Sequence, residues 1–198
     1  MISSLAENWK DSCTPANFIG AGSTRRVYRH GEYVVKIHMH PMGHQQSIRE
    51  EELYDYMNEN GLGHLFAPVY LVNEHICIQR YYEPIPMVDH QTFDLTERDG
   101  DWVIPEKYEQ CLQMLDQEFD AFDLKDSSNY GLNEKRELVF IDYGMTKKLY
   151  EQAWVPAAER GDVPQIDVLP CLVCGIEKEI RLYGEKDTDK RCLECGKV

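Results

Sequence analysis

The fold is decided by Asp123-Leu124-Lys125-Asp126-Ser127-Ser128-Asn129, followed after a short hairpin by Asp142-Tyr143-Gly144. Apolar residues at helical spacing predict a helix over 106–122, immediately before the first of these motifs. Two short apolar runs, 130–132 and 138–141, predict the two strands of the hairpin. Both polar motifs therefore lie directly after a predicted element.

Upstream of this helix, the sequence predicts a small sheet with one helix. Apolar runs within 17–28, 32–38, 65–72 and 75–81 favour five strands around glycine-rich turns. Between the third and fourth strands, residues 45–58 suit a helix that ends at Asn60-Gly61. Strands with one helix among them, followed by a helix and a hairpin, make an α+β order.

Two features of the first strands suggest chemistry. Gly20 and Gly22 lie in a turn where two glycines let a backbone approach a phosphate chain closely, although such turns are also common in ordinary hairpins. Lys36 lies in the apolar strand Tyr33-Val34-Val35-Lys36-Ile37, where a buried ammonium needs an anionic partner. A lysine on the solvent face of the strand is the alternative interpretation.

The helix over 45–58 supplies a candidate partner for Lys36. Leu53, Tyr54 and Met57 follow Glu50 at spacings of three, four and seven residues, so Glu50 shares their apolar face. An acidic residue on such a face requires a cation. Glu51 and Glu52 remain alternative partners if the phase of the helix differs.

In this order, the motifs resemble the protein-kinase superfamily in a very small form. The resemblance covers roughly residues 15–150 and implies a two-lobed fold, with a five-stranded N-lobe containing one helix and a reduced C-lobe. It implies that ATP is bound by the Gly-rich loop, the strand lysine, the helix glutamate and the strand that leads to the adenine hinge. The residues that it assigns to nucleotide binding are Gly20, Gly22, Val27, Lys36, Glu50, Gln79 and Tyr81.

The same resemblance assigns the catalytic and metal-binding roles. Asp123 corresponds to the catalytic aspartate and acts with Lys36, while Asn129 and Asp142 correspond to the ligands of Mg²⁺ or Mn²⁺. A hairpin of this length lets the two oxygen donors converge on one hard cation. Because the interval from Asp123 to Asn129 is one residue longer than usual, Asp126 remains an alternative for the catalytic aspartate.

The chain also departs from the kinase pattern. Arg25 stands where the third glycine of the loop is expected, and Ala121-Phe122 replaces the usual His-Arg before the catalytic aspartate. Too few residues follow Asp142 for a full activation segment and a large helical C-lobe. We therefore expect a minimal kinase-like domain over 1–160, with a truncated substrate-binding part.

The remaining residues, 161–198, predict a separate zinc-ribbon module. It contains two Cys-x-x-Cys-Gly knuckles, and four thiolates form a closed tetrahedral site that suits structural zinc. Acidic and basic residues balance over 171–198, so protein contact or support of the shortened lobe is expected before DNA binding. The four predicted ligands are Cys171, Cys174, Cys192 and Cys195.

Composition limits the partners of the chain. Its 198 residues carry 35 acidic and 21 basic side chains, a net charge of -14, which argues against nucleic-acid coating or an anionic membrane as its target. We expect a cytoplasmic protein, in its own cell or in a host cell, because no signal peptide or apolar span is present.

The other cysteines and a histidine series receive ordinary interpretations. Cys13, Cys77 and Cys111 have no evident histidine partner, so we expect packing roles rather than nucleophiles. His38, His40 and His44 could bind a metal, but exposed loop histidines are the expectation.

Two functions follow from the sequence. The first is an ATP/Mg-dependent phosphotransferase, a kinase that acts on Ser, Thr or Tyr hydroxyls of a protein substrate. The alternative is a pseudokinase-like binding or inhibitory module that captures a protein partner and keeps a vestigial or structural nucleotide site. Nucleotidyl transfer, or phosphorylation of a small molecule, is a third possibility on the same fold.

Overall fold

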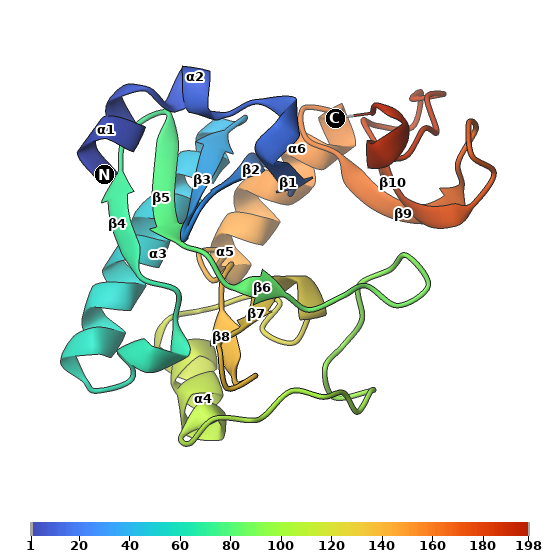
Figure 1. The fold of residues 1–198 in the computed structure, drawn as a ribbon. Helices are drawn as coiled ribbons and strands as arrows, with labels where there is room; N and C mark the ends of the chain where they lie inside the picture. The colour runs from blue at the N-terminus through green and yellow to red at the C-terminus, as the bar shows by residue number, and fades with distance from the viewer. Residues whose placement is uncertain (1, 198) are drawn as a thin grey trace.

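A computed structural model describes residues 2–197 and contains a five-stranded antiparallel sheet with strand order β1-β2-β3-β5-β4 (Figure 1). The last two strands do not follow sequence order: β5 lies inside the sheet beside β3, and β4 forms the edge. The bounds of these strands are β1 Phe18–Ala21, β2 Arg25–His30, β3 Tyr33–His38, β4 Val69–Val72 and β5 Ile76–Arg80.

Helix α3, Pro41–Glu59, connects β3 to β4 and covers one face of the sheet. The His40 imidazole accepts a hydrogen bond from the Met42 backbone N–H, which satisfies one of the free donors at the start of the helix. Proline in the first turn lacks such a donor. The buried face of α3 includes Glu50, Leu53 and Met57.

Two short N-terminal helices, α1 Ile2–Glu7 and α2 Trp9–Ser12, pack beside β4 and β5. Leu5 of α1 is buried in a cluster with Val35, Ile76 and Ile78 of the sheet. Burial of these side chains removes apolar surface from water on that side of the sheet. No pattern in the sequence had led us to expect these two helices.

The second part of the chain is built on helix α4, Tyr108–Glu118, and a three-stranded sheet of order β6-β7-β8. Its core contains Phe66, Leu115, Tyr130 and Phe140, and the Phe66 and Phe140 rings stack with centroids 5.0 Å apart. Residues 85–107 form a long connection without a helix or a strand of the named set. The strand bounds are β6 Glu83–Pro84, β7 Tyr130–Leu132 and β8 Leu138–Phe140.

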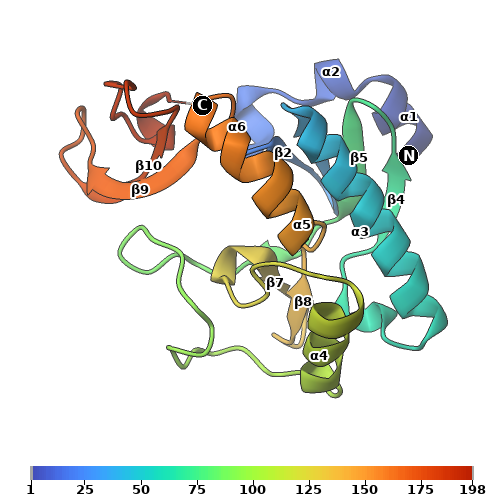
Figure 2. The same cartoon turned by 180° about the vertical axis from the view of Figure 1, so that it is seen from behind.

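After Gly144, the chain forms a nearly continuous helical run. Helix α5, Lys147–Leu149, continues through a π-helical turn, Tyr150–Trp154, into helix α6, Val155–Arg160. Figure 2 shows this run beside α3, and Met42 of α3 is buried against Ala157 and Ala158. The last helical part ends at Gly161, which adopts a left-handed conformation.

The cysteine-rich end forms an antiparallel hairpin of β9, Gln165–Pro170, and β10, Glu177–Leu182, with a 3₁₀ turn at Leu193–Cys195. Arg181 of β10 donates a hydrogen bond to the Gly22 backbone carbonyl at 2.9 Å. Within residues 2–197, no helix is both long and apolar enough to cross a membrane.

The structure confirms the predicted α+β class, with five strands in the first sheet and a helix after the third strand. The helix expected over 45–58 begins earlier, at Pro41, and the one expected over 106–122 is shorter. The fourth strand begins at Val69 rather than at residue 65, and Gly63–Leu65 forms a 3₁₀ turn before it.

Candidate functional site

The centre of the site is a buried ion pair between Lys36 on β3 and Glu50 on α3. The Lys36 ammonium donates to both carboxylate oxygens of Glu50 at 3.1 Å, and to the Ile141 backbone carbonyl at 2.7 Å. Glu50 has no exposed surface and Lys36 is 4% exposed. Glu51 and Glu52, the two alternatives for the partner, are respectively half-buried and exposed. Neither charge of the pair could be buried alone without a large desolvation cost.

Arg25, at the start of β2, is a member of this site that the sequence analysis did not identify. Its guanidinium makes two hydrogen bonds of 2.9 Å to the two carboxylate oxygens of Glu50. It also donates to Asp142 Oδ1 at 2.5 Å and to Ser47 Oγ at 3.2 Å. Although burial opposes its charge, Asp142 and Glu50 raise the pKa of Arg25, so the guanidinium stays protonated. The only signal in the sequence was an arginine at a position where a glycine was expected.

Asp142 follows β8 and lies at the edge of the buried charges. Burial acts to raise the pKa of its carboxyl, but the charges of Arg25 and Lys36 outweigh burial and hold the pKa below its usual range. Asp142 is therefore ionised at neutral pH. Its side chain is 41% exposed, so one side of the carboxylate remains open to solvent.

The two residues after Asp142 fix its position against α3. The Tyr143 hydroxyl donates to the Ala67 carbonyl at 2.7 Å, and the Tyr143 backbone N–H donates to Glu50 at 3.4 Å. A Cβ atom on Gly144 would lie 2.1 Å from the Gln46 carbonyl oxygen. Only glycine therefore allows the chain to pass this closely to the helix.

Asp123 and Asn129 lie in the loop between α4 and β7. Asp123 has a φ of 60°, and the Asn129 side-chain amide donates to its backbone carbonyl at 2.6 Å. The Ile141 backbone N–H donates to the Asn129 carbonyl at 2.8 Å, which joins this loop to the segment of Asp142. Asp126 accepts hydrogen bonds from the Ser128 backbone and hydroxyl, so its carboxylate caps the turn.

The electrostatics of this loop favour a carboxyl that titrates near neutrality. Partial burial, together with the charges of Asp126 and Asp142, raises the pKa of Asp123 to about 6. Asp123 is nevertheless exposed at its surface, so protons can reach it. A carboxyl with such a pKa can accept and release a proton at physiological pH.

The glycine turn is held by two parts of the C-terminal chain. The Gly22 backbone N–H donates to the Arg25 carbonyl at 2.8 Å, which closes the turn, while the Gly22 carbonyl accepts from Arg181. Trp154 donates its indole N–H to Ser23 Oγ at 2.8 Å. Gly20 lies at the end of this turn on β1, opposite Val27 on β2.

Gln79 and Tyr81 lie at the end of β5. The Gln79 amide nitrogen donates to the Ala67 carbonyl at 3.2 Å, while Gln79 Oε1 is buried without a hydrogen-bond partner in the described chain. The Tyr81 backbone N–H donates to the Glu32 carbonyl at 2.8 Å, and the Tyr81 ring stacks on the Arg29 guanidinium. The Tyr81 amide is thus already used within the sheet.

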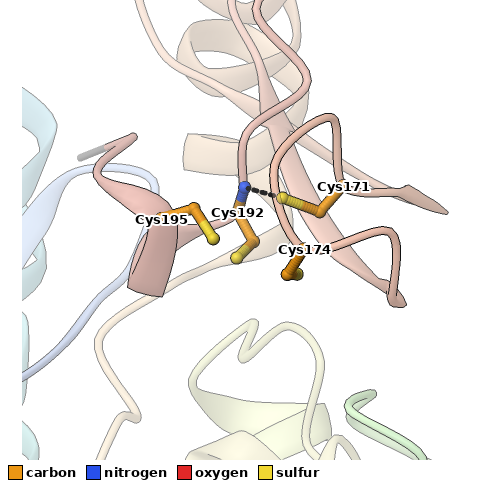
Figure 3. A group of neighbouring side chains, drawn as sticks. All are labelled: Cys171, Cys174, Cys192 and Cys195. Carbon is orange, nitrogen blue, oxygen red and sulfur yellow. Dashed lines mark hydrogen bonds between the residues drawn. The ribbon is translucent and has the colours of Figure 1, made fainter.

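The four cysteines of the C-terminal module form a second site. Their sulfur atoms all lie within 4.8 Å of one another, and among residues 2–197 they are the only such group of potential metal ligands. They come from two turns that face each other, one at the β9–β10 connection and one before the C-terminus (Figure 3). The geometry can hold a metal ion. The ligands are Cys171, Cys174, Cys192 and Cys195.

Backbone N–H groups stabilise negative charge on the Cys171 sulfur. Val173 and Cys192 direct their N–H groups to the Cys171 sulfur at 3.4 and 3.3 Å. Hydrogen bonds of this kind, with that of Cys174 first, lower the pKa of Cys171 to about 6 despite partial desolvation. Gly175 follows the first knuckle with a φ of 72°, a conformation that turns the chain back after the ligands.

The isolated cysteines and histidines have packing and capping roles. Burial raises the pKa of Cys77 and of Cys111 to about 12, so neither is a ready nucleophile. His38 lies on β3 and its ring contacts Ser47 Oγ at 2.9 Å, while His40 caps α3 and His44 lies within that helix. The expectation of loop histidines therefore holds for His40, which lies between β3 and α3, but not for His38 on the strand or His44 in the helix.

In comparisons with known proteins, no family model matches this chain and no curated protein is significantly similar to it. Interpretation of the site thus depends on its own geometry. That geometry brings Lys36, Glu50 and Asp142 together through Arg25, and connects them to Asn129 and Asp123 through backbone and side-chain hydrogen bonds.

Proposed function

We propose that the chain is an ATP- and magnesium-dependent phosphotransferase, a reduced member of the protein-kinase superfamily that acts on a protein hydroxyl group. The observation that carries this proposal is the buried Lys36–Glu50 pair beside the Asp142 segment. Kinases use such a strand lysine, held by a helix glutamate, to position phosphates. The strand order β1-β2-β3-β5-β4, with α3 after β3, agrees with the N-lobe that the sequence motifs imply.

The oxygen donors near the pair fit a magnesium ion. Mg²⁺ prefers hard oxygen ligands and is commonly bound by one or two protein groups together with phosphate. Asp142 offers an ionised, partly exposed carboxylate. The Asn129 amide nitrogen donates a hydrogen bond to the Asp123 carbonyl, which leaves the Asn129 side-chain oxygen for another partner. One carboxylate and one amide oxygen therefore fit the expected ligand set.

The protein groups around the pair also fit a nucleotide. ATP would supply the phosphoryl group, and magnesium would supply positive charge next to it. Lys36 would bind the phosphates, and the backbone of the Gly20–Gly22 turn would cover them. Val27 on β2 and the β5 end at Gln79 and Tyr81 would border the base.

Asp123 would act on the acceptor. Its pKa of about 6 leaves the carboxylate mainly ionised at neutral pH, so it can orient the acceptor hydroxyl and receive its proton as the acceptor oxygen bonds to the γ-phosphorus and ADP leaves. The Asn129 bond to the Asp123 carbonyl fixes the loop in which this carboxylate lies. Positioning of this kind reduces the entropy cost of bringing two reactants together.

For the cysteine module we propose structural zinc. Four thiolates make a closed tetrahedral set, which leaves no open position for catalysis and is typical of structural zinc. The low pKa of Cys171 favours a thiolate at that sulfur, whereas hydrogen bonds with the neighbouring cysteines raise the pKa of Cys195 to about 12, so a bound metal would have to displace that proton. Arg181 of this module also reaches the glycine turn, so the metal would support the loop that covers the phosphates.

A second candidate, a binding module with a vestigial nucleotide site, is favoured by one observation. The Arg25 guanidinium already occupies Asp142 Oδ1, and Lys36 already donates to Glu50 and to the Ile141 carbonyl. The charges of the site are thus satisfied by one another. A protein that only captures a partner could keep this cluster for stability.

Transfer of labelled γ-phosphate from ATP separates the two functions. The wild-type chain, with verified metal content, would be incubated with Mg²⁺ or Mn²⁺ and a generic protein acceptor, next to Asp142→Asn and Lys36→Met. The phosphotransferase predicts labelling of the acceptor or of the chain itself, lost in both variants. No labelling by folded wild-type protein, together with partner capture that persists in both variants, would support the binding module instead.

A further inference from the structure

Arg25 makes the contact that the proposed function does not explain. It is only 3% exposed, although it directly follows the glycine turn, at the position where the resemblance places a glycine. Its aliphatic stem is packed, because a Cβ atom on Gly43 would lie 3.0 Å from Arg25 Cγ. The side chain is therefore built into the site and is not a surface residue that folds over it.

Four charged groups meet at this point, and their charges sum to zero. Arg25 and Lys36 are the cations, and Glu50 and Asp142 are the anions. Glu50 receives both cations, whereas Asp142 has its only ion pair in the described chain with Arg25. Without Arg25, the Asp142 carboxylate would lose the closest positive charge that balances it.

We propose that Arg25 is an internal counter-ion that takes the place of the divalent cation at Asp142 and is displaced when the metal–nucleotide complex binds. This inference rests on the proposed function. A guanidinium and a divalent cation compete for the Asp142 carboxylate, since like charges repel at short distance in a partly buried site. Arg25 therefore raises the metal concentration at which the site becomes half-saturated.

The Arg25 side chain does not have to leave the site to release Asp142. Its two bonds to Glu50 form a bidentate pair, which holds the guanidinium plane in position. Only the hydrogen bond from Arg25 Nη2 to Asp142 Oδ1 has to break. Because the donor stays anchored beside Lys36, its freed N–H remains available to a phosphate oxygen, an anion that the planar guanidinium binds well.

The test measures metal binding without measuring phosphate transfer. Binding of Mn²⁺ to the full-length chain is followed by electron paramagnetic resonance, with a non-hydrolysable ATP analogue present. Arg25→Met keeps the aliphatic stem and removes the charge. Arg136→Gln is the matched control, because Arg136 pairs with Asp101 at 2.6 Å on an exposed hairpin and loses the same charge. Thermal unfolding shows whether each variant is folded.

We expect Arg25→Met to lower the Mn²⁺ concentration at half-saturation by about tenfold or more, the equivalent of one hydrogen bond to a charged group. Arg136→Gln should leave it unchanged. Arg25→Lys, which keeps the charge but cannot bond to Glu50 and Asp142 as a fork, should lie between the wild type and Arg25→Met. This second variant provides the test if Arg25→Met fails to fold.

The outcomes separate this inference from the proposed function. If wild-type protein binds Mn²⁺ with the analogue and Asp142→Asn does not, the proposed site stands. In that case, unchanged or weaker Mn²⁺ binding by the folded Arg25 variants overturns the role of Arg25 alone. If neither the wild type nor any folded Arg25 variant binds Mn²⁺, both the site and the counter-ion are refuted.

Discussion

Removal of the Glu50 charge is expected to lower the stability of the fold strongly. Glu50 has no exposed surface and accepts hydrogen bonds from both Arg25 and Lys36. Glu50→Gln keeps the size of the side chain but leaves two buried cations with a single anion, Asp142. We therefore expect the substitution to destabilise the fold strongly, whether or not nucleotide or metal is bound at this site.

The magnitude follows from the burial of the cluster. Loss of one partner from a buried ion pair costs about 3–5 kcal/mol. For a chain of this size, each kcal/mol lowers the melting temperature by about 2–4 °C, which gives a fall of about 6–20 °C for Glu50→Gln. Glu52→Gln is the control on the same helix, because Glu52 is 59% exposed and pairs with Arg49 at 3.2 Å. An exposed pair of this kind contributes about 0–1 kcal/mol.

Differential scanning calorimetry of the full-length chain, at equal metal content and pH 7, measures both variants. The expected result is a large fall for Glu50→Gln and a small change for Glu52→Gln. Equal melting temperatures for the two variants would refute the buried cluster, since they would show that Glu50 is solvated or that its partners find other anions.

Three further predictions follow from the site and the module. The pKa of Asp123, raised from 3.8 to about 6, means that ionisation is harder in the folded chain, so stability should fall as pH rises from about 4 to about 6. Asp123→Asn should remove that fall in a series of melting curves, and wild-type phosphate transfer should increase through the same range as the carboxylate forms. Gly144→Ala should lower the free energy of unfolding in urea by about 1–3 kcal/mol, because the added carbon would overlap the Gln46 carbonyl. An unchanged urea concentration at the unfolding midpoint would show that the turn has room to move. Cys174→Ser should lower the amount of bound metal measured by mass spectrometry. It should also speed hydrogen exchange at the Gly22 amide, because Arg181 of the module donates a hydrogen bond to the Gly22 carbonyl. An unchanged exchange rate would show that the module does not stabilise the glycine turn.

Local patterns in the sequence predicted the elements, because their causes are local. Apolar spacing placed Glu50 on the inner face of α3, and the structure has Glu50 there, buried with Leu53 and Met57. The two Cys-x-x-Cys turns likewise predicted a four-sulfur cluster, since each turn alone brings two thiolates together.

Contacts between distant segments could not be predicted in this way. Nothing in the residues around Arg25 shows that it turns inward to meet Asp142, 117 positions later in the chain. The helical run after Gly144 was also missed, because it is stabilised by packing of Ala157 and Ala158 on α3. Short helices of this kind have little stability of their own and depend on such tertiary contacts.

A crystal structure of the full-length chain with Mn²⁺ and a non-hydrolysable ATP analogue tests the central claim most directly, because anomalous scattering locates the metal. We expect Mn²⁺ at Asp142 and Asn129, phosphates at Lys36, and an Arg25 guanidinium that has left Asp142 but still contacts Glu50. A nucleotide bound elsewhere would contradict the proposed function, as would an Arg25–Asp142 contact that persists at saturating metal and analogue with no ligand density beside it.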